Sequence, residues 1–317
     1  MGASPATPRV INVASVPHRS PFRYPGGKTW LVPYVRSWLR ALPRRPHEFI
    51  EPFAGGAIVG LSALFEGLAQ RLTLGEIDED IASVWKTILS IQGERLALKI
   101  ASFEFTPESV KWWLSQRPKT LFDRAFQTIL KNRVQRGGII APGAGLFKRG
   151  ENGRGLASRW YPQTLRRRIG TITEERHRIR FVAGDGMALI AENARRNDVA
   201  FFIDPPYTVA GRRLYAHSNV DHERLFRLVS RVKGDFLMSY DDCPAIRRLA
   251  AKHGLQTALV AMKNTHHSIM REALMGRDLS WLGEPLELGN DALFEDIKGN
   301  RGSGRQALNG SLECGQV

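Results

Sequence analysis

Four consecutive residues, Asp204, Pro205, Pro206 and Tyr207, directly follow the apolar run 199–203. Consecutive prolines lack backbone donors and cannot continue a buried strand, so they indicate a rigid, extended turn at the strand end. Such a turn presents the Asp204 carboxylate and the Pro205 carbonyl as two acceptors beside an aromatic ring. An amino group has two N–H donors, and the ring offers a face for stacking. The turn therefore suits a substrate that carries an amino group, the alternative being a purely structural end to the strand.

A second candidate site lies where another strand turns into a helix, in the segment Glu51-Pro52-Phe53-Ala54-Gly55-Gly56-Ala57. Adjacent glycines permit a tight turn in which the backbone approaches a ligand closely. The segment is not the dinucleotide motif G-x-G-x-x-G, and a glycine pair after a strand can be only a turn. Its position after a strand favours a cofactor loop, with Pro52, Phe53, Ala54, Gly55 and Gly56 as candidate contacts.

Two carboxylates, Glu76 and Asp78, lie at the C-terminal edge of the next strand, about twenty residues after the glycine turn. An acidic group at this place can accept hydrogen bonds from both ribose hydroxyls of an adenosyl cofactor. We choose Glu76 for this role, because Asp78 can cap the following helix.

The elements that must position these residues alternate along the chain. Short β-branched or aromatic runs predict strands at 48–53, 71–77, 179–183, 199–203, 235–239 and 257–262. Amphipathic helices follow most of them, with one apolar face formed by Ile58, Leu61, Leu64, Phe65 and Leu68 and another by Leu225, Leu228 and Val229. Strands that alternate with helices predict an α/β fold with a doubly wound, mostly parallel sheet.

The charge of the chain indicates a polyanionic partner. The 317 residues include 46 Lys and Arg against 31 Asp and Glu, a formal net charge of +15. Residues 91–176 contain 17 of the basic and 7 of the acidic residues, so two thirds of the excess lies in just over a quarter of the chain. Clustered cations gain affinity for nucleic acid by releasing counterions from phosphates, and nucleic acid is the leading partner.

Other classes of protein fit the composition poorly. Two cysteines, Cys243 and Cys314, are too few for a disulfide framework or a cysteine zinc site and suit a reducing cytoplasm, so we expect a cytoplasmic protein without a metal. The longest apolar stretches are far shorter than the ~20 residues of a membrane helix, and we expect no membrane partner.

The pattern divides the chain into four parts. We expect a disordered N-terminus at residues 1–20, a discontinuous catalytic domain at 21–90 and 177–285, a basic insertion at 91–176, and a mostly disordered tail at 286–317. The insertion begins with helical sequence through Lys131 and continues with a passage rich in Gly and Arg.

Taken together, these motifs resemble those of the Dam-like DNA adenine-N6 methyltransferases, in the motif order of the alpha group. Residues 23–28 are similar to that family's K-[WY]-x-G-G-K box, residues 51–57 to its E-P-F-x-G-x-G cofactor loop, and residues 204–207 to its D-P-P-Y catalytic loop. Asn132-Arg133 resembles the family's L-N-R, and residues 271–274 resemble its final strand. The resemblance covers roughly residues 22–276.

The resemblance implies a class I S-adenosylmethionine-dependent methyltransferase fold with an inserted, largely helical target-recognition domain. It implies cofactor contacts at Tyr24, Lys28, the glycine loop, Glu76 and Asp204, and we expect Asp185 to bind the adenine amine of the cofactor. The catalytic residues would be Asp204, Pro205, Pro206 and Tyr207, acting on the N6 amino group of an adenine flipped out of double-stranded DNA.

The basic insertion supplies the candidate DNA contacts, which are Arg133, Arg136, Lys148, Arg149, Arg154 and Arg159. The chain departs from the family pattern in having Gly55-Gly56-Ala57 for G-x-G and Glu76 for the usual Asp, and the insertion does not follow the pattern that reads GATC. The alternatives are N4-cytosine, RNA adenine or protein glutamine methylation, or an inactive DNA-binding module; the first and third usually show Ser and Asn at position 204. We expect a monomer, with a restriction endonuclease as a possible partner.

Overall fold

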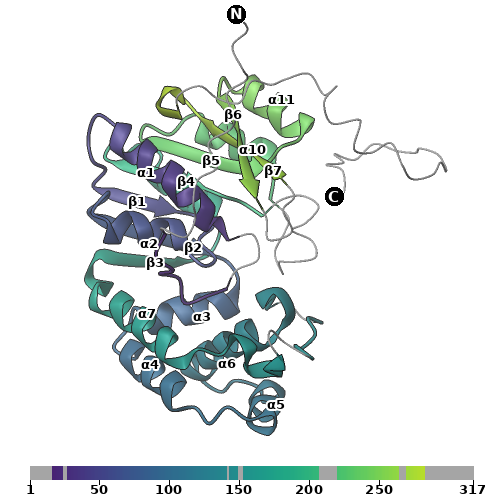
Figure 1. Cartoon of the computed structure of the whole chain (residues 1–317). Helices are drawn as coiled ribbons and strands as arrows, with labels where there is room; N and C mark the ends of the chain where they lie inside the picture. The colour runs from purple at the N-terminus through teal and green to yellow at the C-terminus, as the bar shows by residue number, and fades with distance from the viewer. Residues whose placement is uncertain are drawn as a thin grey trace, which may run out of the picture.

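A computed structural model describes residues 16–23, 27–140, 143–148, 153–206, 220–263 and 269–282. These residues form an open sheet flanked by helices, with a helical region beyond one edge of the sheet (Figure 1). Tyr24, Arg149, Tyr207 and the expected tail at 286–317 lie outside the described residues. Residues 16–20 belonged to the expected disordered N-terminus, yet Val16 and Ser20 are buried, so the packed chain includes this segment.

The sheet has seven strands in the order β3-β2-β1-β4-β5-β7-β6. Strands β1 to β5 are parallel to one another, whereas β7 runs antiparallel to both β5 and β6. The bounds are Glu48–Glu51 (β1), Arg71–Glu76 (β2), Ile179–Ala183 (β3), Val199–Ile203 (β4), Asp235–Asp241 (β5), Gln256–Lys263 (β6) and Ile269–Gly276 (β7). The expected doubly wound, mostly parallel sheet is confirmed.

Both faces of the sheet are covered because its central strands are apolar on both sides. In β4 every residue is buried, and successive side chains enter different cores. Phe202 joins one core with helices α1 (Val32–Ala41) and α2 (Ile58–Phe65), while Phe201 and Ile203 join the other with α8 (Gly186–Asn193), α10 (His222–Val229) and α11 (Pro244–Lys252). Near-continuous apolar strands are typical of a parallel sheet buried between helices.

Four helices lie beyond the β3 edge of the sheet, next to α3 (Glu79–Ile88) (Figure 1). They are α4 (Gly93–Ser102), α5 (Pro107–Ser115), α6 (Leu121–Val134) and α7 (Pro162–Glu174), with the 3-10 helices η3 (Arg136–Gly138) and η5 (Gly155–Arg159) between α6 and α7. Thr106 and Thr120 begin α5 and α6 with reciprocal capping boxes. The insertion is therefore helical over most of its described length, and its role in target recognition stays a prediction.

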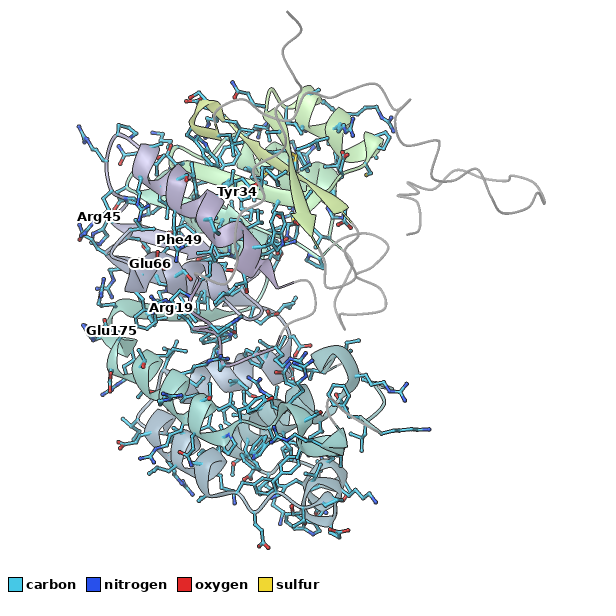
Figure 2. The ribbon with its side chains drawn as sticks, viewed as in Figure 1. Arg19, Tyr34, Arg45, Phe49, Glu66 and Glu175 are labelled. Atoms are coloured by element: carbon cyan, nitrogen blue, oxygen red, sulfur yellow. The ribbon has the colours of Figure 1, made fainter. Side chains whose placement is uncertain are left out.

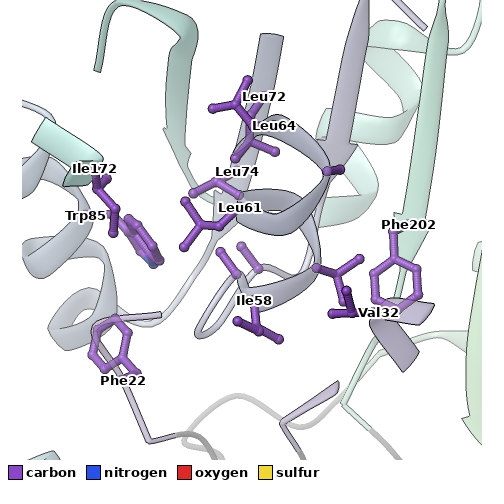
Figure 3. Packing of buried hydrophobic residues seen from close by; sticks show 14 of the residues in the cluster. Phe22, Val32, Ile58, Leu61, Leu64, Leu72, Leu74, Trp85, Ile172 and Phe202 are labelled. Atoms are coloured by element: carbon purple, nitrogen blue, oxygen red, sulfur yellow. The ribbon is translucent and has the colours of Figure 1, made fainter. Parts of the chain in front are cut away.

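One apolar core joins the insertion to the sheet. Figure 3 shows Phe22 of the N-terminal segment, Trp85 of α3 and Ile172 of α7 on one side of this core, with Leu61 and Leu74 beside them. The ring centroids of Phe22 and Trp85 are 6.1 Å apart. Because the core is continuous, the helical region and the sheet pack as neighbours through α3.

Candidate active site at the carboxyl ends of the strands

The candidate site lies at the carboxyl ends of three adjacent parallel strands, β2, β1 and β4. The glycine loop follows β1, Glu76 ends β2, and Asp204 follows β4. Ligands of open α/β sheets bind outside the carboxyl ends of the strands, where the strand order reverses direction. Here β1 and β4 form that reversal, so the structure brings the sequence candidates together at the expected place.

Hydrogen bonds from neighbouring elements fix the glycine loop. The N–H of Ala54 donates to the Gly75 carbonyl at 2.8 Å, and the N–H of Gly55 donates to the Glu76 carboxylate at 3.0 Å. From α3, the Trp85 indole donates to the Gly55 carbonyl at 2.9 Å. Gly55 has a φ of 45°, a left-handed conformation that glycine adopts without steric cost. The loop is therefore held in one conformation by β2 and α3.

The glycine loop packs so closely against β2 and α8 that no side chain fits at Gly75 or Gly186. A Cβ on Gly75 would lie 2.7 Å from the Pro52 carbonyl oxygen, and a Cβ on Gly186 would lie 2.4 Å from the same atom and 2.8 Å from the Phe53 ring. Both distances are shorter than van der Waals contact. Glycine at the end of β2 and at the start of α8 thus lets Pro52 and Phe53 sit directly against these elements.

Glu76 is buried and accepts three backbone hydrogen bonds. Besides Gly55, the N–H groups of Ile77 and Asp78 donate to its carboxylate at 2.8 and 2.9 Å. Burial raises the pKa of Glu76 to about 7, and the backbone donors limit this rise. The carboxylate therefore ties the glycine loop to the end of β2 and changes its charge near neutral pH.

Two other aspartates cap helices. Asp78 accepts from the N–H groups of Asp80 and Ile81 at the start of α3, which confirms the capping role expected for it. Asp185 accepts from the Met187 N–H at 2.9 Å and so begins α8. Asp185 is exposed at the carboxyl end of β3, and its contact with a cofactor stays a prediction.

Asp204 forms part of a buried ion network. The Nζ of Lys28, in the 3-10 helix η2 (Lys28–Leu31), lies 3.2 Å from Asp204 Oδ1 and 2.5 Å from Glu272 Oε1 of β7. The Ser239 hydroxyl of β5 donates to the same oxygen of Glu272. Burial alone would lower the pKa of Lys28, but the charges of Asp204 and Glu272 outweigh it and the pKa is raised. Lys28 therefore remains an ammonium ion.

Further titratable groups surround this network. Glu51, at the end of β1, is buried and accepts from the Gly60 N–H at 2.8 Å; burial and then the charge of Asp204 raise its pKa well above the usual range. The same two causes raise the pKa of the Tyr240 phenol, whose oxygen lies 3.0 Å from His222 Nδ1. Both shifts disfavour further negative charge next to Asp204, and among these groups Lys28 is the cation paired with it.

Local motifs could not have indicated the pairing of Lys28 with Glu272 and Ser239. Lys28 and Glu272 are 244 residues apart in the chain. The available signals were the resemblance of residues 271–274 to a family's final strand and a charged residue in the middle of a strand. A charge buried in a sheet requires a partner, but the pattern does not say which one.

The candidate DNA contacts differ in exposure. Arg136, Lys148 and Arg154 are exposed, and Arg159 is half-buried. Arg133, by contrast, is only 3% exposed, and its guanidinium donates to the Pro21 carbonyl at 2.6 Å. This placement does not suit the contact with DNA that we expected for Arg133, because its donors point into the protein; it fastens the N-terminal segment to α6 instead.

Arg133 lies among other arginines. Burial, followed by the positive charges of Arg168, Arg23 and Arg159, lowers the pKa of Arg133 to about 9. Arg168 donates to the Ser20 carbonyl, and Asn132 clamps the backbone of Arg23 through both its amide oxygen and its nitrogen. In the described chain no carboxylate forms an ion pair with Arg23, Arg133 or Arg168. Positive charge is thus concentrated where the N-terminal segment meets the insertion.

Two kinds of feature are absent from the described residues. No group of three or more His, Cys, Asp or Glu side chains there could hold a metal ion. Within the same residues, no helix is both long enough and apolar enough to cross a membrane.

Comparison with known proteins finds only solved structures of low similarity. No family model and no curated protein matches the chain. Among solved structures, the rRNA methyltransferase AviRa from Streptomyces viridochromogenes is 13% identical, with 86% of this chain and 87% of that chain covered and a TM-score of 0.35. A precorrin methyltransferase from Geobacter metallireducens is 10% identical, with 78% and 86% covered and a TM-score of 0.34. A tRNA methyltransferase from B. subtilis is 11% identical, with 80% and 71% covered and a TM-score of 0.30.

The sheet itself carries the assignment of the fold. Seven strands in the order 3-2-1-4-5-7-6, with β7 antiparallel, are typical of class I methyltransferases. The substrate of this chain is a separate matter and rests on the site.

Proposed function

We propose that this protein is an S-adenosylmethionine-dependent DNA methyltransferase that modifies the N6 amino group of a flipped-out adenine. One observation carries the proposal: Asp204 and Pro205 stand at the carboxyl end of β4, directly beside the glycine loop of β1. A turn that offers two acceptors for an amino group thus adjoins a loop suited to an adenosyl cofactor.

The residues at the strand ends fit the cofactor. Glu76 at the end of β2 and Asp185 at the end of β3 supply acceptor oxygens for ribose hydroxyls and an adenine amine, and the Pro52–Gly56 backbone is fixed beside them. A negative Asp204 also suits a cationic sulfonium group. When bound, S-adenosylmethionine would supply the electrophilic methyl group.

Asp204 and the Pro205 carbonyl would orient the reacting nitrogen. The lone pair of an exocyclic amine is delocalised into its ring, and two hydrogen bonds to these acceptors favour a tetrahedral nitrogen whose lone pair faces the methyl group. Alignment of this kind can supply ~7–11 kcal/mol of the barrier. Asp204 need not be a strong base, because the nitrogen loses its proton readily once it is cationic.

Duplex DNA is the substrate that the charge distribution favours. The insertion holds most of the excess positive charge, and Arg136, Lys148 and Arg154 are exposed on it. Flipping the adenine costs about a few kcal/mol. Stacking on Tyr207 would offset this by ~1–3 kcal/mol, as expected from the sequence of the turn.

The test is a methylation assay with the purified protein, S-adenosylmethionine and unmethylated duplex DNA, followed by mass spectrometry of the nucleosides. We expect N6-methyladenine with the native protein and none with Asp204→Ala, whose DNA affinity should be retained. Circular dichroism of the variant must show the native fold. N4-methylcytosine, or a product on RNA alone, would contradict the proposed substrate.

A further inference from the structure

Glu272 is a buried charge that the proposed reaction does not by itself explain. It lies on β7 with 5% of its surface exposed, and its Oε1 receives both the Lys28 ammonium, at 2.5 Å, and the Ser239 hydroxyl. Ser239 pairs with Leu274 in the ladder of β5 and β7, so Ser239 and Glu272 are diagonal neighbours on one face of the sheet. Strand β7 thus holds the ammonium group of Lys28, which lies 244 residues earlier in the chain.

The two carboxylates hold Lys28 unequally. Lys28 forms hydrogen bonds with both carboxylates, but its Nζ is 0.7 Å closer to Glu272 than to Asp204, so the charge-assisted bond to Glu272 is the shorter one. An ammonium group held only by Asp204 would move onto it, and Asp204 would then spend its acceptor capacity on Lys28. With Glu272 in place, Lys28 neutralises Asp204 from a fixed position, through the longer of its two contacts.

We propose that Glu272 is a positioning residue for methyl transfer: with Ser239 it holds Lys28 beside Asp204, so that Asp204 can accept a hydrogen bond from the amino group of the substrate. This inference rests on the proposed function, because it assigns Asp204 the part of acceptor. It also gives the antiparallel strand β7 a part in the site, through a contact of 244 residues' separation.

The chain contains a closely matched control. Glu48, at the start of β1, is also buried in the sheet, with 8% exposed, and likewise accepts from a hydroxyl, that of Thr73, and from a cation, Arg196. It lies at the amino edge of the parallel strands, opposite the site. Glu48→Gln therefore breaks the same kind of network without touching the candidate machinery.

The experiment compares Glu272→Gln, Glu48→Gln and the native chain in steady-state methylation of duplex DNA over a range of pH. For Glu272→Gln we expect kcat to fall on the order of 10²-fold, the effect of misplacing a reacting group by about 1 Å, with KM for DNA and cofactor affinity little changed. Glu48→Gln should lose stability but keep kcat. Glu272→Asp, which retains the charge, should recover part of the loss.

The pH profile separates positioning from a structural role. Among the described residues, the charged groups around Lys28 are Asp204, Glu272 and Asp241, while Glu51 and Tyr240 adjoin Asp204. Removing the charge of Glu272 leaves burial of Lys28 opposed chiefly by Asp204, so the pKa of Lys28 falls. The alkaline limb of kcat should then move to lower pH in Glu272→Gln and stay in place in Glu48→Gln.

A second readout works without any methylation. The ¹³Cε resonance of labelled lysine, assigned by its loss in Lys28→Arg, reports the charge of Lys28 as pH rises. A lower titration midpoint in Glu272→Gln alone supports the positioning role, even if the native protein fails to methylate DNA and the proposed function is wrong. Equal kcat and an unshifted resonance in Glu272→Gln, or equal kinetic losses in both variants, would overturn the inference.

Discussion

Three carboxylates at the carboxyl edge of the sheet differ in charge because their surroundings differ. Asp204 faces the Lys28 ammonium, Glu76 accepts three backbone N–H groups, and Glu51 is buried with one backbone donor and Asp204 nearby. An opposite charge favours the ionised form, whereas burial and a like charge favour the protonated form. One edge of the sheet therefore holds an acceptor paired with a cation, a group that titrates near neutrality and a group whose pKa burial raises well above the usual range.

The pKa of Glu76 predicts how stability depends on pH. The pKa is about 7 in the folded chain against the ordinary 4.5, so the protonated form is the one that favours folding. The contribution of Glu76 to the free energy of unfolding is fully present below pH 4.5, the pKa in the unfolded chain. It is lost as the pH rises through about 7. The shift corresponds to about 3 kcal/mol, and Glu76→Gln, which cannot ionise, should not show this loss.

The measurement is urea denaturation of the native chain and Glu76→Gln without cofactor, at several pH values between 4.5 and 8. The free energy of unfolding of the native chain, relative to that of the variant, should fall as pH rises across this range. A difference that is constant with pH would contradict the raised pKa.

The residues of the site that lie in short motifs could be predicted from the sequence, and those joined by distant contacts could not. Asp204 and the glycine loop each follow a strand, Glu76 ends one, and parallel strands bring their ends to one edge. Glu272 and Ser239 join Lys28 only through the antiparallel pairing of β7, which no local pattern reveals. The burial of Arg133 is likewise not visible in the sequence: its neighbourhood is basic, but its side chain is buried and donates to the Pro21 carbonyl.

At the scale of elements, the sequence predicts short strands bounded by turn signals well. Strand β4, which is apolar throughout, and the edge strand β3 both have the expected bounds, whereas β1 ends at Glu51, where the loop residues Pro52 and Phe53 follow. Strand β7 was expected only through the family resemblance, because its pattern carries Arg271 and Glu272 in its middle. A strand that is buried on both faces can be predicted from its continuous apolar sequence. The prediction is harder where a strand carries a charged residue that forms a buried ion pair, as Glu272 does in β7.

The contact between α8 and the cofactor loop predicts the effect of one methyl group. Gly186→Ala would place a Cβ 2.4 Å from the Pro52 carbonyl, so the loop or the helix must shift. We expect a loss of about 1–3 kcal/mol in the free energy of unfolding, as for other overpacked sites, together with weaker cofactor binding.

Gly170→Ala in α7 is the matched control, because nothing lies within 4 Å of its Cβ. Alanine favours helix over glycine, so this variant should gain about 0.5–1 kcal/mol and bind cofactor normally. Denaturation and calorimetric titration with S-adenosylmethionine measure both quantities. Equal cofactor affinity in the two variants would show that the loop does not form the cofactor site.

At the scale of the whole molecule, positive charge is concentrated on and beside the helical insertion. The cluster of the buried Arg133 with the half-buried Arg23, Arg159 and Arg168 adds to the exposed Arg136, Lys148 and Arg154. In the described chain, no carboxylate pairs with Arg23, Arg133 or Arg168. Four like charges at this place therefore lower the stability of the folded protein when no ligand is bound. Such an arrangement raises the local potential at the surface above it, which attracts phosphates.

This distribution predicts where DNA lies. The triple variant Arg136→Gln, Lys148→Gln and Arg154→Gln removes three exposed charges of the insertion, and Arg40→Gln, Arg44→Gln and Arg45→Gln removes three from the segment before β1. Figure 2 shows Arg45 at the margin of the sheet region, away from the insertion. Both variants lower the net charge by three, so any difference in their affinity for DNA reflects where the removed charges lie.

The measurement is the affinity for duplex DNA as a function of salt concentration. Removing one side chain that binds a phosphate should reduce the slope of log K against log salt by about 0.9, because fewer counterions are released. We expect a reduction of this size for every insertion residue that binds a phosphate, and little change for the triple variant before β1. Equal slopes in the two variants would mean that overall charge, and not the insertion, attracts DNA, and the helical region would then have to be assigned another partner.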